Sequence, residues 1–465
     1  SRYFDRITRP EQILTSLPQA INVMLDPADC GPAVISMSQD VQGEAYDYPE
    51  IFFEEKIHEI RRIHPDPNQI QKAADKLKQS KQPIIISGGG VLYSEAEEEI
   101  SAFAKKHNIP VTATVMGIGC MNKDDPYYIS AIGCLGEGSS NNLATDTDLA
   151  LAVGTKLGDF TTGSWTNFEN ENFQLVSINT SRFDTTKHRA TPVVSDAKIG
   201  LQELSKALGD WKAPDNWYQR SIEERNKWDE YVAKESGPTN QELPSYAHAV
   251  GAVYRNSDPS DIVVTAAGGL VGEVVQIWKP KELNTFETEW GFSCMSYEIS
   301  GALGIKMAKP DQDVIVFVGD GSYLLQNSDI YSSVLYDKKL IIVVCDNGGH
   351  MVINRLQLAK GGNEYLCNLN AARATNVQFV DFEAHAKSMG ANGETVKSIS
   401  ELEAAFKRAK ESDKTYVISM KTDGYEWLEG TAFWESPTLE VDNTEGKKSA
   451  LNEFLEGKNK QRKGV

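Results

Sequence analysis

Residues 314–349 read VIVFVGDGSYLLQNSDIYSSVLYDKKLIIVVCDNGG, and this stretch indicates the architecture of the second half of the chain. Its two ends, Val314–Val318 and Leu340–Cys345, are continuous apolar runs rich in β-branched residues. Such runs are typical of strands buried on both faces of a parallel sheet. Between them, apolar residues recur at helical spacing from Leu324 to Leu335. The stretch therefore predicts a strand, a helix and a second, parallel strand.

Polar residues follow each of these strands where it ends. Gly319-Asp320-Gly321 follows the first, and Asp346-Asn347 follows the second. Because parallel strands end at the same edge of a sheet, we expect Asp320 and Asn347 to meet there. A carboxylate, an amide oxygen and a backbone carbonyl, together with diphosphate oxygens, form a suitable shell for Mg²⁺. Gly-Asp-Gly alone is equally consistent with an ordinary turn, and the Asn after the second strand makes the pattern specific.

Composition excludes several classes of protein. The net charge of −19 over 465 residues argues against binding nucleic acid or an anionic membrane through a basic surface. No stretch approaches the roughly 20 apolar residues of a membrane span. The six cysteines form no CxxC pair, and Cys345 falls inside a predicted buried strand. This usage fits a reducing compartment, and we expect a cytoplasmic protein without nucleic-acid or membrane partners.

The pattern of strands and helices divides the chain into blocks. Residues 1–50 form one α/β unit, and residues 48–67 read as a linker. Residues 68–208 and 246–435 each alternate helix and strand, as doubly wound domains do. Residues 443–465 are charged and rich in Gly and Lys, which predicts a flexible tail. The sequence thus predicts an α/β protein with two doubly wound parallel-sheet domains plus the remnant of a third.

A second glycine run, Gly88-Gly89-Gly90, follows the strand predicted over residues 83–87. Its position resembles the phosphate turn of a dinucleotide site. It lacks the GxGxxG spacing and an acidic residue about 20 positions further on. The run fits either a bound nucleotide or tight packing of the backbone, and the sequence leaves both possibilities open.

From its first residue to about residue 435, the chain resembles the acetohydroxyacid synthase-like superfamily of thiamine diphosphate enzymes. The resemblance is carried by IIISGGGVL (84–92), EWGFSCMSYEISGALGIKMAKPDQDVIVFVGDGSYLL (289–325) and CDNGGHMVINRLQ (345–357). Within the superfamily, GFSCM, NRLQ and EWLEGTAFWE (426–435) look like the trihydroxycyclohexane-1,2-dione hydrolases of myo-inositol catabolism.

The resemblance implies thiamine diphosphate and Mg²⁺ as cofactors and assigns roles to particular residues. Asp320, Asn347 and the Gly349 carbonyl would hold the metal. The diphosphate would be lined by Gly268, Gly269, Gly319, Gly321 and Ser322. Met295 would support the bend of the cofactor, although a plain core residue on a helix face is the alternative. His350 would either donate a hydrogen bond to a developing oxyanion or only cap the metal loop, which is the loop that begins at Asn347.

The implied reaction is hydrolytic C–C cleavage of a cyclic polyhydroxy 1,2-dione to 5-deoxy-glucuronate. Acetolactate-type ligation and 2-oxoacid decarboxylation are the alternatives within the superfamily. Members place the active site between subunits, which implies a homodimer or homotetramer.

The superfamily activates its cofactor with a glutamate from an N-terminal pyrimidine-binding domain. Residues 1–50 resemble only the end of that domain, so we expect the activating glutamate to be absent and no other residue is assigned its role. A truncated chain, a split enzyme with a separate pyrimidine-domain partner, and a non-catalytic diphosphate-binding subunit would each fit this expectation.

Overall fold

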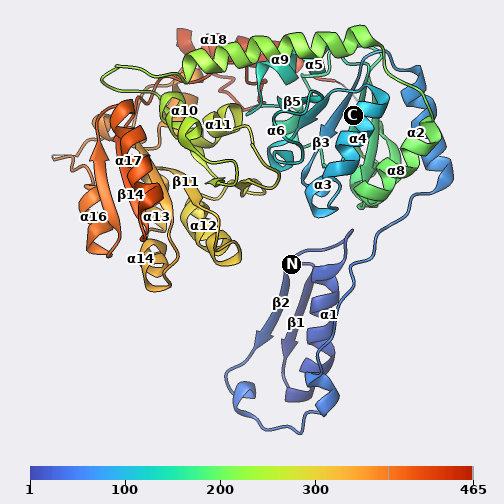
Figure 1. Ribbon diagram of the computed structural model, residues 1–465, viewed down its shortest axis with the longest axis horizontal. Helices are drawn as coiled ribbons and strands as arrows, with labels where there is room; N and C mark the ends of the chain where they lie inside the picture. Colours follow the sequence, from blue (N-terminus) through green and yellow to red (C-terminus); the bar gives the residue numbers. More distant parts are fainter. Residues whose placement is uncertain (375, 443, 463–465) are drawn as a thin grey trace.

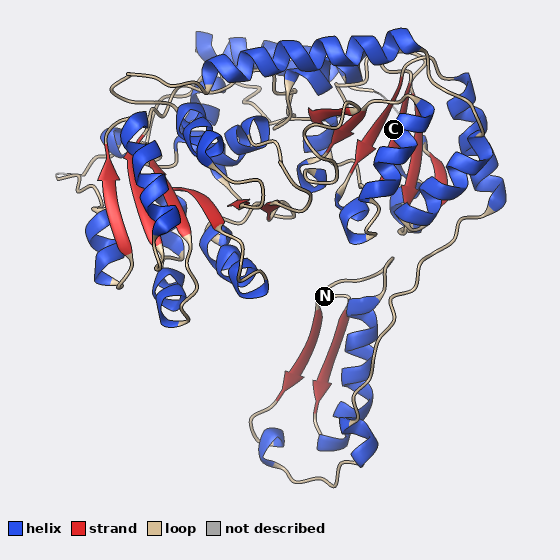
Figure 2. Ribbon diagram, in the orientation of Figure 1, coloured by secondary structure: helices blue, strands red, loops and turns tan. Residues whose placement is uncertain are grey.

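The computed structural model describes residues 1–374, 376–442 and 444–462, and it contains three α/β units in succession (Figures 1 and 2). The two larger units each hold a six-stranded sheet in which every neighbouring pair is parallel. The predicted fold class is therefore confirmed. The domain limits drawn from the sequence stay predictions.

The first unit is a small strand–helix–strand element set apart from the other two in Figure 1. Strand β1 (Tyr3–Ile7) pairs in parallel with β2 (Ala33–Met37), and α1 (Ile13–Leu25) connects them. The sequence predicts α1 and β2 but misses β1. Its alternating apolar and charged residues, YFDRI, do not form the continuous apolar run that marks the other strands.

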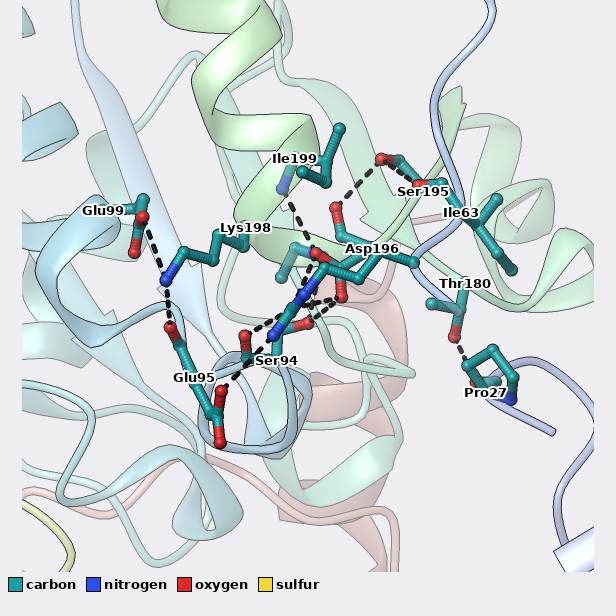
Figure 3. A network of polar contacts seen from close by, with 12 residues as sticks. Pro27, Ile63, Ser94, Glu95, Glu99, Thr180, Ser195, Asp196, Lys198 and Ile199 are labelled. Atoms are coloured by element: carbon teal, nitrogen blue, oxygen red, sulfur yellow. Dashed lines mark hydrogen bonds and ion pairs between the residues drawn. The ribbon is translucent and has the colours of Figure 1, made fainter. Parts of the chain in front are cut away.

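The segment expected to be a linker is attached to the central unit through one buried carboxylate (Figure 3). Asp196 accepts hydrogen bonds from the Arg62 guanidinium (3.0 Å) and the Ser94 hydroxyl (2.6 Å). Its own N–H donates to the Ile63 carbonyl (2.9 Å). Ser195 adds a second connection by donating its hydroxyl to the Ile63 carbonyl (3.0 Å), and Thr180 donates to the carbonyl of Pro27 in the first unit (2.7 Å). Charge and hydrogen bonds thus hold a segment that has no core of its own.

The central unit has the strand order β5-β4-β3-β6-β7-β8. Its strands are β3 (Pro83–Ser87), β4 (Val111–Ala113), β5 (Tyr128–Ala131), β6 (Leu149–Val153), β7 (Gln174–Asn179) and β8 (Thr191–Val194). Its helices are α2 (Pro67–Gln79), α3 (Gly89–Tyr93), α4 (Glu97–His107), α5 (Gly138–Asp146), α6 (Asp159–Thr162), α7 (Arg182–Thr185) and α8 (Ala197–Leu208). Helix α9 (Asp215–Glu235) leads to the next unit and buries Trp217 and Trp228.

The order of strands reverses between β3 and β6, where doubly wound sheets usually bind ligands. Here the glycine run fills that position. A Cβ on Gly88 would lie 2.4 Å from the Gly154 carbonyl oxygen, and one on Gly90 would lie 2.6 Å from the Gly154 Cα. The N–H groups of Gly88 and Gly90 donate to Val153 and Gly154. The structure therefore favours tight packing over a nucleotide for this run.

The third unit has the strand order β10-β9-β11-β12-β14-β13. Its strands are β9 (Ile262–Thr265), β10 (Phe286–Thr288), β11 (Val314–Gly319), β12 (Ile341–Asp346), β13 (Asn392–Val396) and β14 (Tyr416–Lys421). Its helices are α10 (Tyr246–Asn256), α11 (Gly268–Ile277), α12 (Tyr297–Ala308), α13 (Asp320–Leu325), α14 (Ser328–Leu335), α15 (Met351–Ala359), α16 (Phe382–Ser388) and α17 (Ile399–Glu411). Its order reverses between β9 and β11.

Alternate residues of β11 and β12 face two different helix layers, as strands covered on both faces require. Ile315 and Phe317 belong to the apolar cluster that contains α10, α11 and α17. Val316 and Val318 belong to the cluster that contains α12, α14 and α16. The first cluster continues into the central unit, so both large units share one apolar core.

Two expectations need correction. One helix is expected between β11 and β12, but α13 and α14 are separate, and Leu325 and Leu335 are exposed. Tyr323 and Ile330 form the buried contacts instead. In the described part of the expected flexible tail, residues 444–462, α18 (Glu445–Lys460) follows the third unit and Phe433 packs against its Gly457; residues 443 and 463–465 lie outside the described residues. Lys458 pairs with Glu435 at 2.5 Å. Composition alone did not reveal these anchoring contacts.

None of the described helices is long and apolar enough to cross a membrane.

Replacing Gly88 tests the packing at the β3–β6 reversal. Gly88→Ala should lower the free energy of unfolding by about 1–3 kcal/mol, because the added methyl overlaps the Gly154 backbone. The φ of −111° at this position suits any residue, so backbone strain does not contribute. Denaturant unfolding followed by circular dichroism measures the change.

Gly304→Ala is the matched control, since Gly304 lies inside α12 and a Cβ there would meet no described residue outside its own stretch of helix within 4 Å. This variant should be unchanged or more stable by up to about 1 kcal/mol. Equal stability of the two variants would contradict the packing role of Gly88.

Candidate functional site

The register between β11 and β12 builds the candidate site at one sheet edge. Gly319 lies opposite Cys345, so the next residues, Asp320 and Asp346, come side by side as the strands end. Asn347 follows directly. Asp320 and Asn347, 27 positions apart in the sequence, thus lie at one edge, as the sequence predicts.

Two oxygens at this edge are buried without a hydrogen-bond donor among the described residues: Asp320 Oδ1 and Asn347 Oδ1. The Asn347 amide nitrogen is occupied, since it donates to the Tyr246 hydroxyl (2.6 Å). Buried polar atoms without partners are rare in proteins and often indicate an ion or a ligand. Carboxylate and amide oxygens are ligands that Mg²⁺ accepts, so this pair fits a cation.

Asp346 makes a useful contrast because its charge is already balanced. It accepts the Gly348 N–H (3.0 Å) and pairs with Lys421 Nζ (2.5 Å). Burial and the neighbouring Asp346 charge raise the pKa of Asp320 to about 7, against the lowering effect of nearby backbone N–H groups. A bound cation would supply the positive charge that Asp320 lacks.

Carboxylates, imidazoles and thiols do not complete a metal site by themselves here. Among the described residues, no group of three or more His, Cys, Asp or Glu side chains is placed to hold a metal ion. Further ligands would have to come from the Asn347 amide, from a backbone carbonyl such as that of Gly349, and from a bound diphosphate.

The β9–β11 reversal lies beside this edge and is bridged by a buried carboxylate that sequence reasoning missed. Glu298, near the start of α12 and 1% exposed, accepts the Ala267 N–H (3.3 Å) and the Ser322 hydroxyl (2.9 Å). Ser322 Oγ in turn accepts the Ser296 N–H (2.7 Å). Glu298 thereby ties together the turn after β9, the loop before α12 and the turn after β11. The sequence carries one signal for this role, which is a single glutamate near the otherwise apolar start of the helix.

This network limits what Ser322 can do. Its hydroxyl hydrogen is already donated to Glu298, so its backbone is the part left for a phosphate. The glycines expected along the diphosphate lie at these same turns. Gly268 adopts a positive φ of 79° at the start of α11, and Gly269 packs against Trp427, where a Cβ would lie 2.0 Å from the ring. Among the described residues other than its chain neighbours, only the Tyr246 hydroxyl would come within 4 Å of a Cβ on Gly319, at 3.9 Å.

Met295 and His350 occupy loops next to these turns. Met295 is half-buried, precedes α12 and belongs to none of the apolar clusters of the described residues, so the alternative of a helix-face core residue does not describe it. The His350 ring packs on Gly321, where a Cβ would lie 2.6 Å from Cε1. The His350 N–H donates to the Cys367 carbonyl (2.8 Å). Both roles considered for His350 remain predictions.

Comparison with protein families matches both large units. Residues 70–204 match the family described as "Thiamine pyrophosphate enzyme, central domain". Residues 266–420 match "Thiamine pyrophosphate enzyme, C-terminal TPP binding domain". The second match contains Asp320, Asn347, Glu298 and the turn after β9, so the candidate site lies within the matched residues.

Several bacterial proteins named 3D-(3,5/4)-trihydroxycyclohexane-1,2-dione hydrolase are similar over nearly the whole chain. The protein of Halalkalibacterium halodurans is 37% identical over 96% of this chain and 74% of its own length. The protein of Shouchella clausii is 37% identical over 93% of this chain and 72% of its own length. The protein of Bacillus subtilis is 35% identical over 97% of this chain and 74% of its own length. At this identity and coverage, the chain belongs to the thiamine pyrophosphate enzymes and, among them, to the family of the trihydroxycyclohexane-1,2-dione hydrolases.

Proposed function

We propose that this chain belongs to an enzyme that hydrolyses 3D-(3,5/4)-trihydroxycyclohexane-1,2-dione in inositol catabolism. Water adds across the bond between the two carbonyl carbons, so one carbon becomes a carboxylic acid and the other an aldehyde. The reaction needs no oxidant or reductant, and it opens the ring to a single product. The similarity to hydrolases of this name, over 96% of the chain at 37% identity, carries the proposal.

Thiamine diphosphate, when bound, supplies a nucleophilic carbon and an electron sink for C–C cleavage. Asp320 and Asn347 would hold Mg²⁺ through their two unpartnered oxygens, with the Gly349 carbonyl as a third protein ligand. Glu298 would keep the turns around the diphosphate in place. The diphosphate itself would lie along Gly268, Gly269, Gly319, Gly321 and the Ser322 backbone, with Met295 beneath the cofactor.

We propose a cytoplasmic location and a homodimer or homotetramer. All six cysteines are free in the described structure, which suits a reducing compartment. The assembly is proposed from the family resemblance.

Turnover of the cyclic dione tests the reaction. The enzyme that contains this chain, supplied with Mg²⁺, thiamine diphosphate and a pyrimidine-binding domain, should open the cyclic dione to an acid, followed by NMR, and should leave pyruvate unchanged. Consumption of pyruvate without ring opening would contradict the proposed hydrolysis and favour ligation or decarboxylation.

Asp320→Ala tests the metal site. Loss of residues that only support metal ligands costs about 10- to 100-fold in affinity, so loss of a direct ligand should weaken Mg²⁺-dependent binding of thiamine diphosphate by at least about 100-fold. Calorimetry with and without EDTA measures this without requiring turnover. Asp311→Ala, an exposed carboxylate of the same unit, should bind normally. Unchanged affinity of Asp320→Ala would refute the metal assignment.

Glu298→Gln tests the positioning of the three turns. The variant keeps the shape and one acceptor but loses the charge that holds the Ser322 hydroxyl, so cofactor affinity should fall by about 10-fold, in line with the loss of a hydrogen bond to a charged group. The melting temperature without cofactor should stay close to that of the parent. Glu137→Gln, a second buried glutamate outside the site, controls for burial and should leave cofactor affinity unchanged. A fall in stability without a change in affinity would contradict the positioning role.

A further inference from the structure

A cavity of about 590 Å³ lies next to the cofactor turns. One wall is α15, with Asn354, Arg355, Leu358 and Ala359, and the other is the segment Gly424–Thr431 that follows β14. Its volume is in the range of small-molecule sites. No role in metal or diphosphate binding falls to the residues that line it.

Trp427 joins this cavity to the candidate cofactor site. Its ring packs on Gly269 at the start of α11 and meets Tyr246 edge-on, with ring centroids 5.7 Å apart. The Tyr246 hydroxyl accepts the Asn347 amide (2.6 Å). Helix α15 begins at Met351, directly after the metal loop. A molecule in the cavity would therefore share its walls with the cofactor turns.

Asn354 lines the cavity and carries a hydrogen-bond acceptor without a donor. It is fully buried, and its Nδ2 donates to Glu364 (2.9 Å). Because a carboxylate accepts hydrogen bonds, the amide nitrogen must face Glu364 and the oxygen must face away. Oδ1 has no donor among the described residues. A buried acceptor without a donor is costly, and a ligand hydroxyl would satisfy it.

Arg355 supplies donors on the same helix. Its guanidinium lies over the Trp427 ring, 4.9 Å from the centroid, and makes no hydrogen bond or ion pair within the described part of the chain. The buried Glu273, which accepts the Leu428 N–H (3.0 Å), partly balances its charge. A free acceptor and a nearby carboxylate disfavour an anionic ligand, while free donors and an aromatic face suit a neutral ring with hydroxyl and carbonyl groups.

We propose that this cavity binds the neutral polyhydroxy ring of the substrate. Asn354 Oδ1 accepts from a ring hydroxyl, the Arg355 guanidinium donates to ring oxygens, and Trp427 covers one face of the ring. Asn354 and Arg355 then determine specificity for a hydroxylated ring over a 2-oxoacid. This inference rests on the proposed function, because it names the site of that substrate.

Hydroxyl recognition is tested by comparing binding of trihydroxycyclohexane-1,2-dione with that of unsubstituted cyclohexane-1,2-dione. Calorimetry on the protein with Mg²⁺ and thiamine diphosphate should show tighter binding of the hydroxylated ring. Asn354→Ala should reduce this preference by about 10-fold, because a site that hydrogen-bonds the hydroxyl groups of its ligand rejects analogues that lack them. Asn368 and Tyr425 still donate to Glu364 in this variant, so the rest of the network persists. An unchanged preference would overturn the inference.

Arg355→Met keeps the apolar stem on Trp427 and removes the donors. The KM for the hydroxylated dione should rise about 10- to 100-fold, the usual effect of losing hydrogen bonds from a charged group, with cofactor affinity unchanged. Lys360→Met, the next cation along the chain and outside the cavity, should behave like the parent.

The outcomes separate this inference from the proposed function. Suppose that the parent opens the ring, that Arg355→Met keeps the parent KM and that Asn354→Ala keeps the parent preference for the hydroxylated ring. These results would overturn the cavity assignment and leave the proposed function standing. Binding of pyruvate in place of either dione by the parent would overturn both.

Discussion

The parallel register of β11 and β12 is the constraint on which the candidate site depends. Pairing Gly319 with Cys345 makes the two strands end together, and only then do Asp320 and Asn347 lie at one edge. A shift by one residue would turn every side chain of a strand to the opposite helix layer. The apolar clusters on the two faces therefore fix the register, and the register fixes the polar edge.

The two large units use the same architecture in opposite ways. In the central unit, Gly88, Gly90 and Gly154 press together at the strand-order reversal, and their polar backbone groups are satisfied within the protein. In the third unit, Glu298 holds the turns at the corresponding reversal, and oxygens at the adjacent edge remain without partners. One reversal is closed by packing, and the other is equipped for a ligand.

Long apolar runs made much of the fold predictable. The strand expected over residues 83–87 matches β3 to the residue, and those expected over 314–318 and 340–345 match β11 and β12 to within one residue, because continuous apolar runs have few alternatives. Short or mixed segments were missed, among them β1, β5 (YISA) and β13 (NGETV), whose pairing depends on neighbours distant in the sequence.

The site was predictable where polar residues end a buried strand, as Asp320 and Asn347 do. Glu298 and Asn354 lie near or inside helices, where neither a turn nor a spacing marks them. Their importance depends on tertiary contacts: Glu298 gains it from Ala267 and Ser322, and Asn354 from Glu364. A single sequence holds the residues of such networks but not the contacts that connect them.

The two oxygens that lack a partner among the described residues also bear on the stability of this edge. Burial and Asp346 raise the pKa of Asp320 from 3.8 to about 7, so the folded chain binds this proton more tightly than the unfolded chain. Its contribution to stability therefore falls as the pH rises from about 4 toward 7. Near neutral pH, a cation beside Asp320 would remove that cost by favouring the ionised carboxylate. Asp346 differs because Lys421 Nζ lies 2.5 Å from its carboxylate. Among the described residues, no lysine forms such a pair with Asp320, so a cation bound at this edge would stabilise the folded chain.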